Sequence, residues 1–385
     1  MSSEPSRHRE VHPACFLIVA LPVITFWVNG WVVPNIGVPL LDVAPERLLD
    51  PDKGYAEAAG RNKFLGALLF FVVIVIVAVI AFAAEMLRPL SRATKAWALV
   101  VFVAAQVPVW QEVIQQQDDS IANWRSYHQL GDGVMEQVLS YGDVRLCQTF
   151  QTTGQGEARV ERFVDDPDKT LFPGQPCTDN PAMQLFRSLI DFIILLSGIG
   201  VVSLVLGVIL SLSRSPDHVP LEERAFEHGM NQKTARKFLY LAGLMLSSGM
   251  FLAMTWMHWP LPLVQEKQLD IYESVVNATL FYYGVFYTLL IVTGFGTLLI
   301  VTGFGPVMYL AARRSEALAM ENLGAGQPMA QPVPGKGAPE PPTVSAIEKW
   351  KAAHGLRISM TEAIQALLAT TSPLLTAFAG SFSPV

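Results

Sequence analysis

Polar and ionisable side chains inside long apolar runs are the residues of this chain that could do chemistry. Asp191 and Arg187 lie four residues apart, so on a helix they share a face and can pair. His258 lies near the end of another apolar run, and Gln106 lies deep in a third. Because a charged or polar group in hydrocarbon is costly, these four residues are candidates for lining an ion or solute pathway.

The same four residues also allow a purely structural interpretation. Asp191 and Arg187 can neutralise each other near the membrane surface, and His258 can be an interfacial polar residue. Gln106 and the nearby Pro108 fit a kinked helix that either lines water or bonds its neighbours. The sequence leaves both interpretations open.

No catalytic or metal-binding motif points to an enzyme. The sequence lacks H-E-x-x-H, G-x-S-x-G and a glycine loop with a phosphate-binding lysine. His8 and His12 have the four-residue spacing of a metal pair, but they lie in a charged segment before Pro13, which favours an unstructured terminus. We therefore predict no catalytic residue, no metal site and no cofactor.

Six long apolar runs must position these residues. Hydrophobic residues make up 51% of the chain and charged residues 16%, and the mean hydropathy is +0.36, which is typical of a membrane protein. A helix needs roughly 20 apolar residues to cross a bilayer, and lipid offers no partner for an open backbone, so each run predicts a transmembrane helix. The runs cover residues 14–33, 64–86, 96–110, 188–212, 238–262 and 276–311.

The basic residues between the runs predict the orientation. If the N-terminus is cytoplasmic, the inner segments carry most of the lysines and arginines of the short loops, among them Arg88, Arg92, Arg214, Lys237, Arg313 and Arg314. Basic residues near membrane ends resist translocation, so both termini are expected in the cytoplasm. The membrane is expected to be the plasma (inner) membrane of a bacterium. The net charge of -6 argues against a nucleic-acid partner.

The longest outer segment, residues 111–187, is expected to form a small extracytoplasmic cap. Its first part spaces Val134, Met135 and Val138 as one helical face, and its later glycines and prolines indicate turns around short strands. Cys147 and Cys177 both fall here, and a disulfide between them would contribute about 3 kcal/mol. Two unpaired thiols are the alternative.

Small residues indicate where helices meet, because they let two backbones approach closely. The fourth run carries such residues on one face, and Gly243 and Ser247 of the fifth run are expected to meet that face. The second run has almost no polar atom and is expected to face lipid. The small residues of the fourth run are Gly200, Ser203, Gly207 and Ser211.

The sixth run contains an exact tandem duplication. The nine letters TLLIVTGFG at 288–296 recur at 297–305, which lengthens a helix by about 13 Å. Whether the run forms one long helix or a broken one stays open.

After the sixth run, residues 322–344 are rich in proline, glycine and alanine and predict a flexible linker. Residues 345–385 are expected to form a cytoplasmic amphipathic helical tail, in which Ser359 and Glu362 match a capping box.

The sequence therefore predicts an all-α integral membrane protein with six spans, namely helices 1–3 in residues 1–110 and helices 4–6 in residues 188–321. The leading functional hypothesis is an ion or small-solute pathway, either an oligomeric pore or a small transporter. The alternative is a membrane sensor or assembly scaffold, in which the cap binds a partner or signal and the tail relays it. The expected partners are the lipid bilayer and a second copy or another membrane protein.

Overall fold

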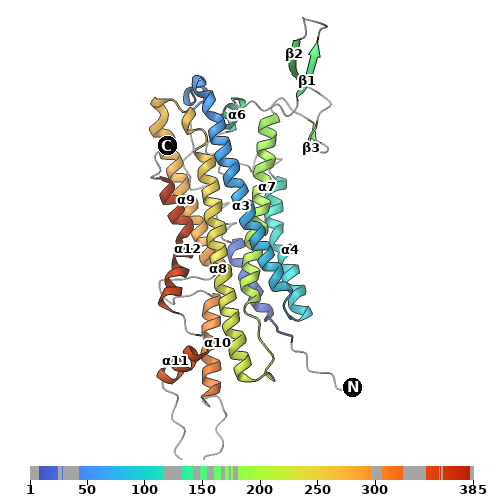
Figure 1. Cartoon of the computed structure of the whole chain (residues 1–385), viewed down its shortest axis with the longest axis vertical. Helices are drawn as coiled ribbons and strands as arrows, with labels where there is room; N and C mark the ends of the chain where they lie inside the picture. Colours follow the sequence, from blue (N-terminus) through green and yellow to red (C-terminus); the bar gives the residue numbers. More distant parts are fainter. Residues whose placement is uncertain are drawn as a thin grey trace, which may run out of the picture.

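The computed structural model describes residues 8–24, 28, 43–115, 132–141, 148–153, 160–165, 170–172, 175–176, 181–295, 306–323, 344–354, 356 and 359–381. These residues form a long helical bundle, with short strands only between positions 148 and 176 (Figure 1). Five long helices make up most of the bundle: α3 (Glu57–Met86), α4 (Arg92–Gln115), α7 (Pro181–Leu210), α8 (Leu221–Met257) and α9 (Leu269–Phe295).

Within the described residues, four helices are long and apolar enough to cross a membrane, which by length and composition indicates a multi-pass membrane protein. They cover Pro51–Met86, Arg92–Gln111, Pro181–Leu210 and Leu221–Leu263, which contain the second to fifth apolar runs. The first run begins with the 3-10 helix η1 (Pro13–Val19) and is helical as far as Ile24, which is shorter than a span. The sixth run falls in α9 and α10 (Pro306–Asn322), and the second copy of the duplication lies outside the described residues.

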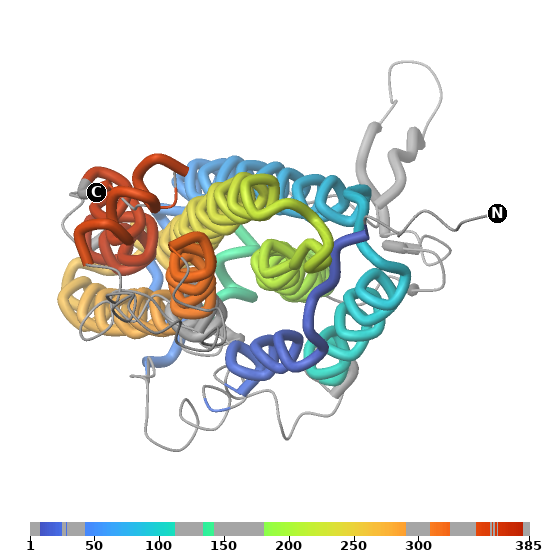
Figure 2. The backbone as a smooth tube through the Cα atoms, turned by 90° about the horizontal axis from the view of Figure 1, so that it is seen from below, coloured from blue at the N-terminus to red at the C-terminus, as the bar shows by residue number. Residues whose placement is uncertain are grey.

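Helix α7 lies at the centre of the bundle. It contacts α3, α4, α8 and η1, which surround it when the bundle is viewed along its axis (Figure 2). Leu204, Leu206 and Ile209 of α7 are completely buried, as expected for an apolar helix that neighbours enclose on all sides.

Helices α3 and α4 differ in how much of their surface the protein covers. Phe64, Phe71 and Val75 of α3 are buried against α7 and α8, so this helix is not simply the lipid-facing wall that its composition predicts. In the most apolar stretch of α4, only 17% of the residues are buried, whereas in that of α3 the share is 44%. The helix with the larger lipid-facing surface is therefore α4.

One end of the bundle, which we call the α6 end, is closed by short elements: α2 (Pro45–Leu48), η3 (Pro51–Ala56), α6 (Asp132–Ser140), η6 (Leu261–Leu263) and η7 (Glu266–Gln268). The backbone N–H of Gln265 donates to Leu48 O at 2.8 Å, and that of Asp50 donates to Leu263 O at 2.8 Å. Val134, Met135 and Val138 of α6 are buried, which confirms the helical face predicted there.

The predicted strands beyond α6 are also present. β1 (Gln148–Thr153) pairs antiparallel with β2 (Val160–Asp165), and β3 (Thr170–Phe172) pairs with β4 (Gln175–Pro176). Cys147 and Cys177 lie outside the described residues, so the disulfide stays a prediction.

The opposite end, which we call the α10 end, carries α10, α11 (Val344–Ala353) and the loops after α3 and α7 (Figure 1). The last helix, α12 (Met360–Ser381), begins near this end and then packs lengthwise against α8 and α9. The amphipathic helical tail expected in the cytoplasm thus contacts two of the long helices through α12. The Ser359 Oγ accepts from Glu362 N at 3.2 Å, and Glu362 Oε2 accepts from Ser359 N at 2.8 Å, which confirms the capping box.

Candidate functional site

An apolar cavity of about 250 Å³ lies inside the bundle. It lies between α3, α4, α7, α8, α9 and the segment that begins with η1. On α7 the lining residues follow helical spacing, with Ile190, Ile193, Ile194 and Val201 on one face. The facing helices contribute aromatic and aliphatic side chains, including Phe64, Phe71, Ala105, Val109, Met245, Trp256, Phe286 and Tyr287.

Few polar groups line this cavity. The Ser197 hydroxyl donates to its own helix at Ile193 O, 2.7 Å away, and so presents little polarity to the cavity. Trp256 is buried, and its indole Nε1–H has no hydrogen-bond acceptor among the described residues. The cavity therefore suits an apolar occupant, and its one buried unpartnered indole could donate to an acceptor on that occupant.

Gln106 lies beside the cavity wall. Its Nε2 donates to the backbone oxygen of Gly198 at 3.4 Å, and its buried Oε1 has no donor within the described structure. A Cβ on Gly198 would meet Gln106 Oε1 at 3.2 Å and Val109 at 2.8 Å. The glycine thus permits α4 to approach α7, and Gln106 bonds a neighbouring helix as its structural interpretation predicts.

The other pathway candidates do not converge on the cavity. Asp191 and Arg187 belong to α7, but neither lines the cavity, whereas their neighbour Ile190 does. His258 caps the end of α8, where its backbone N–H donates to Met254 O at 2.9 Å. Arg187 and Asp191 therefore lie together on α7, whereas Gln106 lies on α4 and His258 at the end of α8, and none of the four lines the cavity.

The small residues predicted to mediate packing do so with different partners than expected. A Cβ on Gly200 would meet Met245 Sδ at 2.6 Å, and one on Gly207 would overlap the Phe238 ring, so α8 inserts bulky side chains into the small-residue face of α7. Ser203 of α7 and Ser211, which follows the last residue of that helix, are buried and donate to the backbone oxygens of Ile199 and Val208.

From the sequence we predicted that Gly243 of α8 meets α7, and the structure gives it another neighbour. A Cβ on Gly243 would instead overlap the backbone oxygen of Ala369 in α12. The Oγ of Ser247, four residues later, is buried without a hydrogen-bond partner in the described part of the chain.

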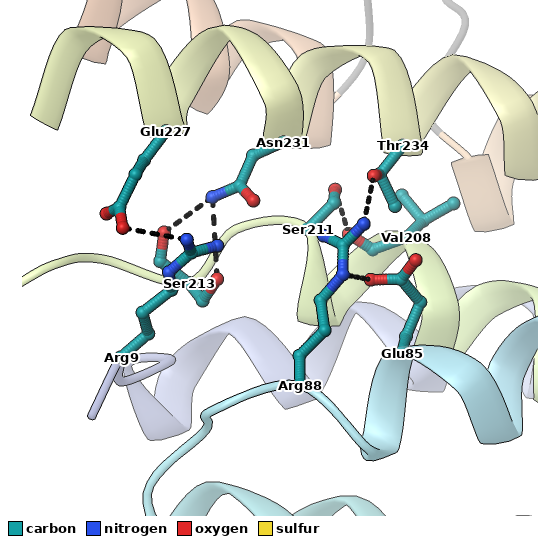
Figure 3. A network of polar contacts seen from close by, with 9 residues as sticks. All are labelled: Arg9, Glu85, Arg88, Val208, Ser211, Ser213, Glu227, Asn231 and Thr234. Atoms are coloured by element: carbon teal, nitrogen blue, oxygen red, sulfur yellow. Dashed lines mark hydrogen bonds and ion pairs between the residues drawn. The ribbon is translucent and has the colours of Figure 1, made fainter. Parts of the chain in front are cut away.

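A polar layer closes the α10 end of the bundle (Figure 3). Arg88 Nε pairs with Glu85 at 2.9 Å, and its Nη2 donates to Thr234 of α8 at 3.2 Å. Glu85 is only 5% exposed, so it is held inside the protein rather than extended to the surface. Asn231 Nδ2 donates to Ser213 O at 3.0 Å, which ties α8 to the end of α7.

The N-terminal segment is part of this layer. Arg9 Nη2 lies 2.7 Å from Glu227 Oε1, and both side chains are largely covered. The backbone of Arg9 and Glu10 forms isolated β-bridges with Leu90 and Arg214, so it joins the α3–α4 loop to the α7–α8 loop. Sequence reasoning missed this role because the segment is short, charged and rich in histidine. The arginine ahead of an apolar run was its only signal.

Helix α10 completes the polar layer. His228 Nε2 lies 2.9 Å from Ala311 O and 3.1 Å from Ser315 Oγ, and Gln232 Nε2 donates to the same hydroxyl at 2.9 Å. Arg314 donates to Leu212 O, and burial lowers the pKa of its guanidinium to about 10, so it stays charged at neutral pH.

The polar layer holds the loops at the α10 end together. Within the described ranges, no group of three or more histidine, cysteine or acidic side chains could hold a metal ion. Its polar groups are mostly bonded to one another and to backbone oxygens, which fixes the loops at this end. Comparison with family models, with curated proteins and with solved structures finds no match.

Proposed function

We propose that this chain is a multi-pass protein of the plasma (inner) membrane that takes an apolar small solute into its central cavity. The observation that carries the proposal is the cavity of about 250 Å³ with its apolar lining. An apolar cavity of about 150 Å³ is large enough to bind benzene, so a longer or branched molecule fits here. An ion would lose its hydration without gaining ligands, which disfavours the ion branch of the pathway hypothesis.

The proposed topology has six spans and a cytoplasmic N-terminus. The basic residues of the polar layer support this orientation, because Arg9, Arg88, Arg214 and Arg314 gather at the α10 end with α8 residues Arg224 and Arg236. Basic residues at one membrane side mark the cytoplasm. The cap with β1 to β4 then faces outward, where an oxidising compartment would allow the Cys147–Cys177 disulfide.

The proposal is tested with purified protein in liposomes. Transfer of a fluorescent fatty acid or isoprenoid between leaflets is compared with potassium and proton flux under an imposed potential. We expect solute transfer without ion flux. Ion flux with no transfer of either apolar probe would contradict the proposal.

A cavity-filling variant sharpens the test. Ala105 lines the cavity and is 8% exposed, so Ala105→Phe should fill part of it and reduce transfer. Leu99 lies on the same helix with 55% of its surface exposed, and Leu99→Phe is the matched control that should leave transfer unchanged. If the two variants reduce transfer equally, transfer does not depend on the cavity.

A sensor or assembly scaffold is the second candidate, and one observation favours it. Because α12 packs against α8 and α9, a movement of those helices would be transmitted directly to the segment that carries α11. This candidate predicts no transfer of any probe, but a changed protease sensitivity of the 322–344 linker when the cap binds its partner. Unchanged cleavage with active transfer would reject it.

A further inference from the structure

Helix α12 lies along α8 and contacts first the charged part of α8 and then its apolar part. Arg236 forms an ion pair with Glu362 at the start of α12, and Tyr240 donates to Gln365 at 3.4 Å one turn later. Gly243 then contacts Ala369. Along these three contacts the residue numbers increase in the same direction on both helices. Helix α12 therefore runs parallel to α8 and points toward the α6 end (Figure 1).

The far half of α12 packs on α9. A Cβ on Gly284 would lie 2.6 Å from the Cβ of Ala377 and 3.3 Å from the Cα of Leu374. The 22 residues of α12 extend about 33 Å, which matches the roughly 30 Å of a hydrocarbon core. The helix therefore has the length and the neighbours of a membrane span.

The face of α12 turned away from α8 and α9 is apolar and exposed. Its residues continue the exposed apolar surface of the two neighbouring helices, where Leu244 and Phe251 of α8 and Phe281 and Val285 of α9 are also exposed. In water such a surface would be costly, whereas lipid chains cover it without cost. The exposed large hydrophobic residues of α12 are Ile364, Leu367, Leu368, Leu375 and Phe378.

The hydroxyl residues that make α12 look too polar for a span are satisfied within the helix. Thr370 donates to Ala366 O at 2.7 Å, Thr371 to Leu367 O at 3.0 Å and Thr376 to Ser372 O at 2.8 Å. A hydroxyl bonded back to its own helix adds little polarity in lipid.

Pro373 inside α12 is compensated in the same way. Proline cannot donate to the oxygen four residues earlier, which leaves Ala369 O without its usual partner. Ser372 Oγ takes that place at 2.8 Å and also reaches Gly243 O at 3.2 Å. Such replacement of a lost backbone bond is how prolines are tolerated in membrane helices.

The charges around α12 have the asymmetry of a span that crosses outward. Lys349, Lys351 and Arg357 precede it, and no charged residue follows Glu362 as far as Val385. Basic residues stay on the cytoplasmic side, so the carboxyl end of such a helix is translocated.

We propose that α12 crosses the bilayer beside α8 and α9 as an additional transmembrane span, with its lipid-exposed face in contact with acyl chains and its carboxyl end outside the cytoplasm. This replaces the cytoplasmic tail expected from the sequence, and it rests on the orientation given under the proposed function. The α10 and α11 segment remains cytoplasmic.

The full chain with a short epitope tag at either end tests the proposal in spheroplasts of a bacterial host. We expect a tag after Val385 to be labelled by antibody in intact spheroplasts, with little increase on permeabilisation. A tag before Met1 should be labelled many-fold more strongly after permeabilisation. Labelling of both tags only after permeabilisation, or of both without it, would overturn the proposal. Exposure of the N-terminal tag alone would keep α12 as a span and reverse the proposed orientation instead.

A charge on the lipid-exposed face gives a second test. Leu368→Arg should prevent α12 from crossing and make the C-terminal tag inaccessible in intact spheroplasts, while the protein remains in the membrane through its other helices. Val344→Arg, at a position that is 78% exposed on α11, is the control and should leave C-terminal labelling unchanged. A C-terminal tag still fully labelled in Leu368→Arg would contradict the contact with lipid.

Discussion

At the scale of single residues, glycine decides how closely α12 approaches α8. Gly243 faces the backbone oxygen of Ala369, so Gly243→Ala must push the two helices apart, at a cost of about 1 to 3 kcal/mol. Gly66 on α3 is the matched control, because a Cβ there meets nothing within 4 Å. We expect thermal unfolding in detergent to occur several degrees lower for Gly243→Ala only. Because alanine has a higher helix propensity than glycine, a similar loss in Gly66→Ala would mean that the loss in Gly243→Ala does not come from the contact with Ala369.

Glu362 makes the stability of the start of α12 dependent on pH. Its hydrogen bond from the backbone N–H of Ser359, together with the Arg236 guanidinium, lowers the pKa of the carboxyl below its ordinary 4.5. A lowered pKa in the folded state means that the stabilisation is present above pH 4.5 and is lost as the pH falls through the lowered value.

Glu362→Gln keeps an acceptor for the Ser359 N–H but removes the charge that pairs with Arg236. We therefore expect it to lower the free energy of unfolding by about 0.3 to 1 kcal/mol at pH 7. The difference from the wild type should shrink in a titration toward pH 3. Glu348→Gln on α11 controls for the removal of an exposed acidic residue. A difference that does not depend on pH would argue against the carboxylate.

Sequence reasoning identified the capping box of α12 from its spacing, but it could not identify the partner of Gly243. In the sequence, Gly243 and the small residues of α7 show the same spacing of small side chains. Only the structure shows that Met245 and Phe238 occupy the small-residue face, which leaves Gly243 to α12. The pathway candidates were chosen for their polarity. The cavity could not be predicted, because apolar residues that line a cavity and apolar residues that pack in a core look the same in a sequence.

At the scale of elements, the N-terminal segment and α8 are coupled through Arg9 and Glu227. Their side chains are 18% and 19% exposed and lie 2.7 Å apart. A double-mutant cycle with Arg9→Ala and Glu227→Ala should give a coupling of about 1 to 2 kcal/mol in thermal or denaturant unfolding. The Glu348–Lys351 pair within α11 serves as a reference of about 0.3 kcal/mol. A coupling no larger than that of the reference would mean that backbone bonds alone hold the segment.

The apolar runs predicted α3, α4, α7 and α8 because a membrane span needs only length and hydrophobicity. The same criterion failed for α12. Its threonines and Pro373 reduce hydropathy, and their compensation by hydrogen bonds is invisible in the sequence. For the sixth run the sequence left open one long helix or a broken one. The structure describes α9 as far as Phe295 and α10 from Pro306, and positions 296–305 lie outside the described residues.

At the scale of the whole molecule, α4 offers the surface on which a second copy could pack. Only 17% of its apolar window is covered, and Val100, Val103 and Val107 are exposed in a row. For a homo-oligomer we expect light scattering, corrected for detergent, to give a multiple of 42.2 kDa. Val103→Trp should then reduce the assembled fraction, with Ile80→Trp on the exposed face of α3 as the control. A mass of one chain would leave this face to lipid.

The β-bridges of Arg9 and Glu10 have a consequence for how the protein is made. Leu90 is synthesised about 80 residues after Arg9, whereas Arg214 is synthesised about 200 residues after Glu10. The N-terminal segment can therefore pair early with the α3–α4 loop, but its bridge to the α7–α8 loop has to wait until α7 has been made. Its docking is completed in a late step, and the α10 end is closed only then.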